Sequence, residues 1–388
     1  MSRGGLGLGV ALLGVVLALA LWPDGEARAP RAGIQATLAV REALGGDAAG
    51  FARARAPRPL SFPEDHGPHP EFRTEWWYYT GNLRTAAGRH VGFQLTFFRV
   101  ALAPPAPPSA EPPPSAWAAR HLLVAHLAVT DTAGGRFHAA SRTSRAALGL
   151  AGAQARPFRV WVEDWSVEGE PPAALPMRLR AADGEVAFDL ELSTSRPVVL
   201  QGERGLSRKG PEPGNASYYY SFTRMPARGV VRIGAETLEV SGLAWMDREW
   251  STSALGPDLA GWDWFAVQLD DGRDLMVYRL RRHDSTADPF SAGTLVAPDG
   301  TARHLGAGDF AVETLDTWTS PRSGVRYPAR WRVTVPSADL TVELRPRLAD
   351  QELVVGPRYW EGAVAVEGAA AGRPVAGHGY VELVGYGE

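Results

Sequence analysis

Two acidic side chains stand among large aromatic rings in the segment Trp245–Trp250. Side chains of an extended strand alternate between its two faces, so Asp247 and Glu249 are expected to share one face with Trp245, opposite Arg248. A carboxyl group buried among rings has a raised pKa and keeps its proton. Such a group can act as a general acid, and each desolvated ring can stabilise a nearby cation by about 0.5 to 2 kcal/mol.

This combination suits the addition of water to an unactivated carbon–carbon double bond. That reaction needs an acid, a pocket that tolerates a tertiary cation and a placed water, and we expect no cofactor. Asp247 is the first candidate for the acid, Glu249 or Glu75 is the second, and His126 could orient water or relay a proton. The alternative is structural: Arg248 and its acidic neighbours form an ion-pair lattice that closes a barrel end, and His126 is a hydrogen-bonded core residue.

Large rings that could line a ligand cavity, or instead fill a core, recur in several predicted strands. Alternation sends about half of each run to the other face, so each ring has two possible roles. The candidate ligand-binding rings are Trp76, Trp77, Tyr78, Tyr219, Trp245, Trp262 and Trp264.

The loop Asp65–Glu71 carries two histidines and two carboxylates just before an aromatic strand. The spacing does not match a zinc-binding helix, and prolines on both sides of His69 stiffen the loop. We therefore expect a plug or lid that is hydrogen-bonded to the barrel and holds no metal, with a metal site as the alternative. The chain also lacks a Gly-x-Ser-x-Gly elbow, a P-loop and a Gly-x-Gly-x-x-Gly fingerprint, which argues against serine hydrolase and nucleotide chemistry.

The composition describes a globular chain and excludes several classes of function. The chain has 388 residues, of which 45% are apolar and 21% are charged, which is enough for two ordinary domains. A net charge of -3 offers no basic surface for nucleic acid. There is no cysteine, so disulfides and thiolate chemistry are excluded. Lys209 is the only lysine, which we attribute to genomic base composition.

The N-terminus has the features of an export signal. An apolar stretch up to Trp22 is followed by Ala27-Arg28-Ala29, the small-x-small pattern of a signal peptidase site. We expect a signal peptide over 1–29, a flexible lead-in over 30–57 and a periplasmic or secreted protein whose membrane contact is limited to this segment. An uncleaved inner-membrane anchor is the alternative.

From residue 58 onwards, strand-like runs alternate with turn signals and helical periodicity is nearly absent. Predicted strands include Thr74–Leu83, His90–Val100, Leu122–Asp131, Phe158–Val167 and Val186–Leu192. A hairpin is predicted where Asp270-Asp271-Gly272 separates two further runs. We expect an all-β chain with one domain over 58–250 and a second over 251–388.

Several of these motifs together resemble the AttH/CrtC family: FPEDHGPHPEFRTEWWYYTGNL, GFQLTFFR, SYYYSFTRM, VSGLAWMDREWSTS, GWDWFAVQL, YWEGAVAVEG and GYVELVGY. The resemblance implies two lipocalin-like antiparallel β-barrels in tandem, with a cavity for an apolar ligand. Family members include predicted secreted hydrolases, carotenoid 1,2-hydratases and fungal kievitone hydratase. The resemblance thus implies an exported protein that binds a lipid or isoprenoid and hydrates a double bond by acid catalysis. Exported relatives are commonly encoded beside ABC transporter permeases, so a non-catalytic lipid-binding or transporter accessory role is the alternative.

Overall fold

The computed structural model describes residues 49–105, 115, 119–194, 196–252, 255–256, 258–356 and 358–387. The expected signal peptide over 1–29 and most of the lead-in over 30–57 lie outside the described residues. Among the residues that are described, no helix is both long and apolar enough to cross a membrane.

The first sheet contains thirteen strands, all paired antiparallel, in the order β4-β3-β2-β1-β13-β12-β9-β8-β7-β6-β5, and β10 and β11 also pair with β12. Its strands are β1 (Thr74–Arg84), β2 (His90–Ala101), β3 (His121–Asp131), β4 (Arg136–Arg145), β5 (Ala151–Ala155), β6 (Phe158–Val162), β7 (Trp165–Gly169), β8 (Met177–Asp183), β9 (Val186–Leu192), β10 (Val199–Leu200), β11 (Leu206–Arg208), β12 (Ala216–Ile233) and β13 (Glu236–Ser251).

The second sheet contains ten strands in the order β17-β16-β15-β14-β23-β22-β20-β19-β18, with β21 paired to β22. Its strands are β14 (Leu259–Leu269), β15 (Asp274–Arg282), β16 (Ala292–Val296), β17 (Ala302–Gly306), β18 (Ala311–Thr319), β19 (Arg326–Val335), β20 (Leu340–Pro346), β21 (Glu352–Val354), β22 (Arg358–Ala370) and β23 (Arg373–Val384). In both sheets the first strand pairs with the last, β1 with β13 and β14 with β23.

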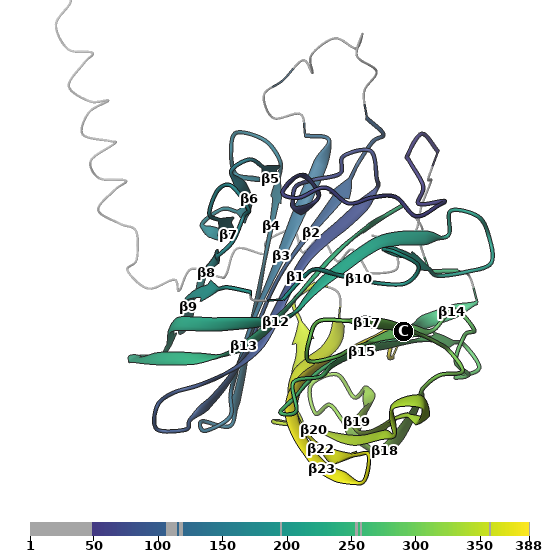
Figure 1. The fold of residues 1–388 in the computed structure, drawn as a ribbon. Helices are drawn as coiled ribbons and strands as arrows, with labels where there is room; N and C mark the ends of the chain where they lie inside the picture. Colours follow the sequence, from purple (N-terminus) through teal and green to yellow (C-terminus); the bar gives the residue numbers. More distant parts are fainter. Residues whose placement is uncertain are drawn as a thin grey trace, which may run out of the picture. The chain divides into compact units, whose positions relative to one another are not determined.

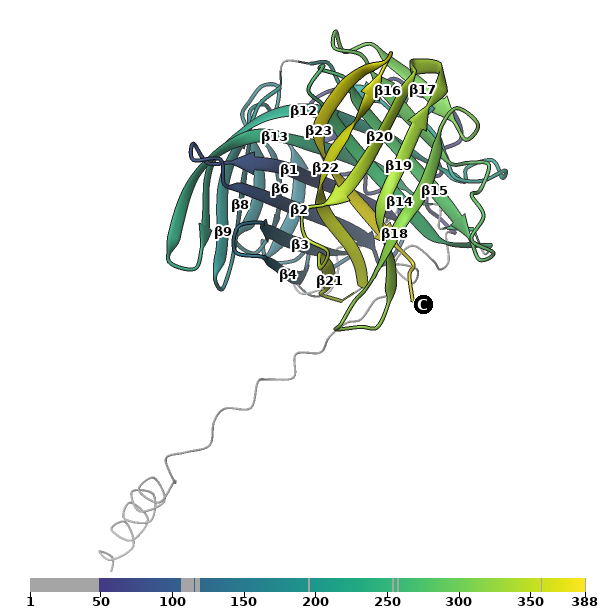
Figure 2. The same cartoon turned by 90° about the horizontal axis from the view of Figure 1, so that it is seen from below.

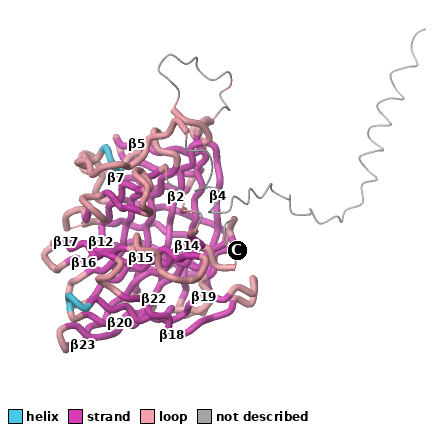
Figure 3. Tube along the Cα trace, turned by 90° about the vertical axis from the view of Figure 1, so that its right-hand side faces the viewer, coloured by secondary structure: helices cyan, strands magenta, loops and turns pink. Residues whose placement is uncertain are grey.

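The all-β fold class is confirmed. The two antiparallel sheets curl into one nearly closed barrel and one half-barrel (Figure 1). Within the described residues the helical elements are two short 3-10 turns, Glu64–His66 and Pro336–Ala338 (Figure 3). The prediction of one strand over Phe158–Val167 is wrong. The chain turns at Glu163, which has a φ of 56°, and the two halves pair as β6 and β7.

Side chains of the two sheets form three large buried layers and one small cluster that includes Tyr359. One fills the interior of the first sheet and includes Trp77 and Trp250, and a second fills the interior of the second sheet around Trp331. The third contains rings from both sheets, among them Tyr78 of β1 and Trp264 of β14. It lies where β22 and β23 cross β1 and β2 (Figure 2). We call this third group, with the polar side chains between its rings, the inter-sheet layer.

Candidate functional site

The predicted alternation along β13 is confirmed. Asp247 lies opposite Tyr78 in β1 and opposite Ser221 in β12, on the face that packs into the inter-sheet layer. Arg248 and Trp250 point the other way, into the interior of the first sheet. Asp247 and Glu249 therefore lie on one face of β13, and Arg248 lies on the other.

On the interior face, Arg248 binds Glu75. The guanidinium Nη2 lies 2.5 Å from a carboxylate oxygen of Glu75, and Arg99 pairs with the other oxygen. Burial acts to raise the pKa of Glu75, but the two arginines hold it well below its usual range. Arg248 also stacks 3.9 Å over the ring of Trp77. The structure thus places Glu75 and Trp77 in the interior core and does not bring them together with Asp247.

The loop before β1 is hydrogen-bonded to the sheet, as expected for a plug. The ring of His69 bonds Asp65 through Nε2 at 2.9 Å and Glu75 through Nδ1 at 3.2 Å, and it stacks 3.8 Å from the ring of Trp250. Arg248 donates to the backbone carbonyl of Gly67 at 2.5 Å. Across the described ranges, no group of three or more metal-ligating side chains is placed to hold an ion.

Asp247 is buried, with 4% of its surface exposed, and none of the described cationic side chains forms an ion pair with it. Its carboxylate accepts hydrogen bonds from three neutral groups: the Tyr219 hydroxyl at 2.5 Å, the Ser221 hydroxyl at 2.6 Å and the Trp245 indole at 2.7 Å. Burial raises the pKa of Asp247 to about 7, against the lowering effect of these donors. The two hydroxyls can turn to accept, so the surroundings suit both protonation states.

Glu249 has different surroundings from Asp247, two residues earlier on the same face. It accepts a hydrogen bond from Ser217 and lies 3.3 Å from the ammonium of Lys209. Lys209 in turn sits 4.1 Å from the centre of the Tyr278 ring. Burial acts to lower the pKa of Lys209, but the Glu249 carboxylate and the Tyr278 hydroxyl together outweigh this effect and the pKa is raised. Lys209, the one lysine of the chain, is therefore not merely a mark of base composition, because it pairs with Glu249 and contacts the Tyr278 ring.

The remaining predicted rings, apart from Trp77, lie in or beside the inter-sheet layer. Tyr219 and Trp245 contact Asp247, and the Trp264 indole donates to the Tyr219 hydroxyl at 3.2 Å. Trp76 and Trp262 pack against this layer and are partly exposed. The layer therefore meets solvent near these two tryptophans.

His126 points into the same layer from β3. One ring nitrogen, Nδ1, bonds the Tyr359 hydroxyl of β22 at 2.7 Å, and this bond ties the two sheets together. The other nitrogen is buried and has no hydrogen-bond partner among the described residues. Burial lowers the pKa of His126 to about 4, so the ring is neutral at pH 7.

Two carboxyl groups that sequence reasoning missed, Glu361 and Glu382, complete the site. They are paired neighbours on β22 and β23. Burial raises the pKa of Glu382 to about 7, against a 2.7 Å hydrogen bond from the Trp262 indole, while Asp247 and Glu249 add repulsion. Burial, with repulsion from Glu382, raises the pKa of Glu361 well above its usual range. The only available signal was their position in two of the motifs that carry the family resemblance.

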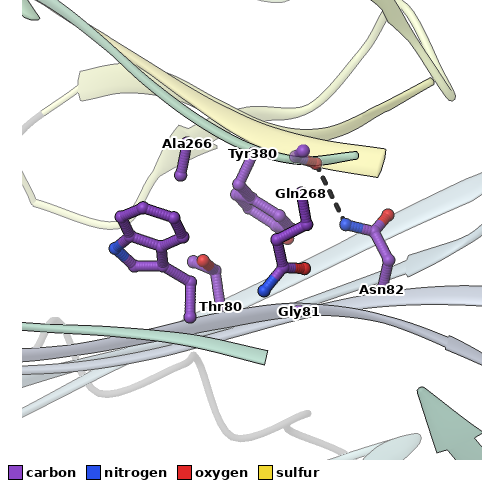
Figure 4. Close-up of a pocket in the computed structure, with 8 residues that line it drawn as sticks. Thr80, Gly81, Asn82, Ala266, Gln268 and Tyr380 are labelled. Atoms are coloured by element: carbon purple, nitrogen blue, oxygen red, sulfur yellow. Dashed lines mark hydrogen bonds between the residues drawn. The ribbon is translucent and has the colours of Figure 1, made fainter. Parts of the chain in front are cut away.

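A cavity of about 10 Å³ opens between the sheets, roughly the room that one water molecule needs. Thr80 from β1 and Tyr380 from β23 point toward each other across it, beside Gln268 (Figure 4). Trp245, whose indole bonds Asp247, also lines it. The cavity therefore has room for about one water beside Trp245, whereas a larger ligand must displace side chains of the layer.

The buried carboxyl groups of the inter-sheet layer can hold and transfer protons among aromatic side chains. Asp247, protonated below about pH 7, can donate a proton, and Glu249, paired with Lys209, can accept one. Asp247 and Glu249 are two residues apart on one strand, which places their Cα atoms about 7 Å apart, and their different surroundings suit an acid and base pair.

The fold and this layer place the chain among lipocalin-like proteins with two curled sheets. The profile of the family described as AttH-like matches residues 53–386, and the chain belongs to that family. It is similar to a solved structure described as an AttH from Nitrosomonas europaea, with 36% identity, a TM-score of 0.77 and coverage of 87% of this chain and 99% of the other.

One curated relative and one structural neighbour carry the names of enzymes. Dehydratase asqC of Emericella nidulans is 25% identical over 227 residues, and the match covers 54% of this chain and 61% of that protein's length. Kievitone hydratase from Nectria haematococca has a similar structure, with 16% identity, a TM-score of 0.64 and coverage of 86% of this chain and 95% of the other. CghA, solved with Sch210972, has a similar structure, with 16% identity, a TM-score of 0.52 and coverage of 88% of this chain and 97% of the other. The two structural likenesses concern the fold alone.

Proposed function

We propose that this protein adds water to, or removes water from, an apolar substrate that binds between the two sheets. The observation that carries the proposal is the buried carboxyl group of Asp247, which has three neutral hydrogen-bond donors and a pKa of about 7. The names of the relatives, a dehydratase and a hydratase, agree with this class of reaction.

In the hydration direction, Asp247 donates its proton to one alkene carbon, and the aromatic quadrupoles of Tyr219 and Trp264 stabilise the cation on the other. Water attacks the cation, and Glu249 accepts the proton that the water loses. In the reverse direction, a protonated Glu249 gives its proton to the leaving hydroxyl group, and the carboxylate of Asp247 removes the proton from the neighbouring carbon. Atoms balance in both directions, and neither requires an oxidant or a reductant.

The test uses heavy-oxygen water. The purified protein is incubated in it with apolar extract of bacterial membranes and with a panel of isoprenoid alkenes, and products are analysed by mass spectrometry. We expect a product that carries the heavy isotope. Its rate of formation is expected to fall at least about 100-fold in Asp247→Asn. The exposed Glu239→Gln on the same strand is the matched control.

An Asp247→Asn protein that retains full turnover would contradict the proposal. A natively purified protein that carries a lipid and returns it unlabelled would favour the alternative, a carrier or an accessory of an ABC transporter.

A further inference from the structure

Buried polar atoms without hydrogen-bond partners concentrate in the inter-sheet layer. Of sixteen such side-chain atoms among the described residues, seven lie on the two surfaces that face each other there. All belong to side chains with at most 6% of their surface exposed. They are Tyr78 Oη, Thr80 Oγ1, Gln94 Oε1, His126 Nε2, Glu361 Oε1, Glu361 Oε2 and Tyr380 Oη. We call these six side chains the unpaired cluster.

The unpaired cluster comes from both sheets and converges. Its members on β1, β2 and β3 lie in two adjacent rows of paired positions, one through Tyr78 and His126 and one through Thr80 and Gln94. Glu361 and Tyr380 face them from the second sheet. The hydroxyls of Tyr78 and Tyr359 are close enough to Glu361 to lower its pKa as hydrogen-bond donors, although neither is in strict hydrogen-bonding geometry with it.

Such a concentration is costly for a folded protein. A buried polar atom without a partner costs about 1–3 kcal/mol, so native proteins keep few of them. One water makes two to four hydrogen bonds, and the adjoining cavity holds about one water. That water can satisfy only part of the cluster, so the remaining atoms are available to a ligand.

The chemistry of the cluster selects the kind of ligand group. No described cationic side chain forms an ion pair with Glu361, which argues against a carboxylate or phosphate. A protonated Glu361 and the hydroxyls of Tyr78 and Tyr380 are donors to a neutral oxygen, and the neighbouring rings contact an apolar skeleton. A plain hydrocarbon would leave all these groups unpaired.

We propose that the unpaired cluster binds a hydroxyl or carbonyl oxygen of the substrate, so that the substrate is an oxygen-bearing isoprenoid or similar apolar molecule rather than a hydrocarbon. The location rests on the proposed function, because it assumes that the inter-sheet layer receives the substrate. The oxygen-binding role concerns affinity and not turnover, so it can be tested separately.

The experiment measures binding of matched probes by quenching of tryptophan fluorescence. The probes are pairs of equal carbon number at three chain lengths: geraniol with myrcene, farnesol with farnesene, and geranylgeraniol with its hydrocarbon. Farnesal tests the carbonyl group. We expect the wild-type protein to bind at least one oxygen-bearing probe about tenfold or more tightly than its hydrocarbon partner.

Two variants locate the preference. In Glu361→Met and in Tyr380→Phe the preference is expected to fall to within about threefold, with affinity for the hydrocarbon retained or increased. Glu367→Gln, an exposed change on the same strand as Glu361, is expected to keep the wild-type preference. A wild-type protein that binds no oxygen-bearing probe more tightly at any length, or variants that keep the full preference, would overturn the proposal.

Thermal unfolding separates this role from a structural one. Since no donor reaches the Glu361 oxygens in strict hydrogen-bonding geometry, Glu361→Met is expected to unfold at the wild-type temperature or higher. If the carboxyl group stabilised the fold, the substitution would lower the unfolding temperature. A clear decrease in this variant would contradict the proposal. Failure of the labelling experiment alone would reject catalysis and leave the binding preference as a separate result.

Discussion

Replacement of Asp247 by asparagine is expected to make the protein more stable, and increasingly so as the pH rises. The carboxyl group has a pKa of about 7 in the folded chain and an ordinary value of 3.8. Between these values the folded chain holds a proton that the unfolded chain has lost, so stability falls as pH rises from about 4 to 7 and then levels off. At about 1.36 kcal/mol per pH unit, the full difference is about 4 kcal/mol.

Asparagine keeps the shape of the side chain and does not ionise. The advantage of Asp247→Asn over wild type is therefore about 2 kcal/mol at pH 5 and about 4 kcal/mol at pH 8, offset by a constant for its altered hydrogen bonds. The assay is urea unfolding at several pH values, with Glu239→Gln as control. Stability curves of Asp247→Asn and wild type that run parallel from pH 5 to pH 8 would refute the reasoning, because they would show that Asp247 has an ordinary pKa.

Three further predictions concern the ion pairs of the interior core and the other carboxyl groups of the inter-sheet layer. Glu75→Gln leaves Arg248 and Arg99 buried without their carboxylate, so we expect a loss of about 3–5 kcal/mol in urea unfolding, and a loss below about 1 kcal/mol would argue against the ion-pair core. Lys209→Met removes the cation beside Glu249 and is expected to lower turnover at least tenfold. Unchanged turnover in this variant would exclude Glu249 as the base. Trp262→Phe removes the indole donor to Glu382 and should raise the pKa of that carboxyl above about 7, measured by carbon NMR; a lower value would contradict the assignment.

The sequence allowed much of the fold and one half of the site to be predicted. Period-two alternation was enough to put Asp247 and Glu249 on one face of β13 and Arg248 on the other. Alternation within one strand does not tell which strand pairs with it or in which register. The registers that set Tyr78 opposite Asp247, and Glu75 opposite Trp250, depend on the pairing of segments more than 150 residues apart.

The other half of the site could not be found in this way. Glu361 and Glu382 lie on strands of the second sheet, and Glu382 comes near Asp247, as Glu361 comes near Tyr78, only because the two sheets pack face to face. No local pattern encodes that packing. Lys209 lies in a turn-rich segment after β11, where nothing in the sequence indicates an ion pair with Glu249.

The protonation of Asp247 at neutral pH can be measured directly by infrared spectroscopy, without a substrate. We predict that the difference spectrum between wild type and Asp247→Asn contains the carbonyl band of a protonated carboxyl group at pH 6, and that this band disappears with a midpoint near pH 7. Absence of the band at pH 6, with the carboxylate bands already present, would contradict the account, because an ionised Asp247 cannot supply the proton that the proposed reaction needs.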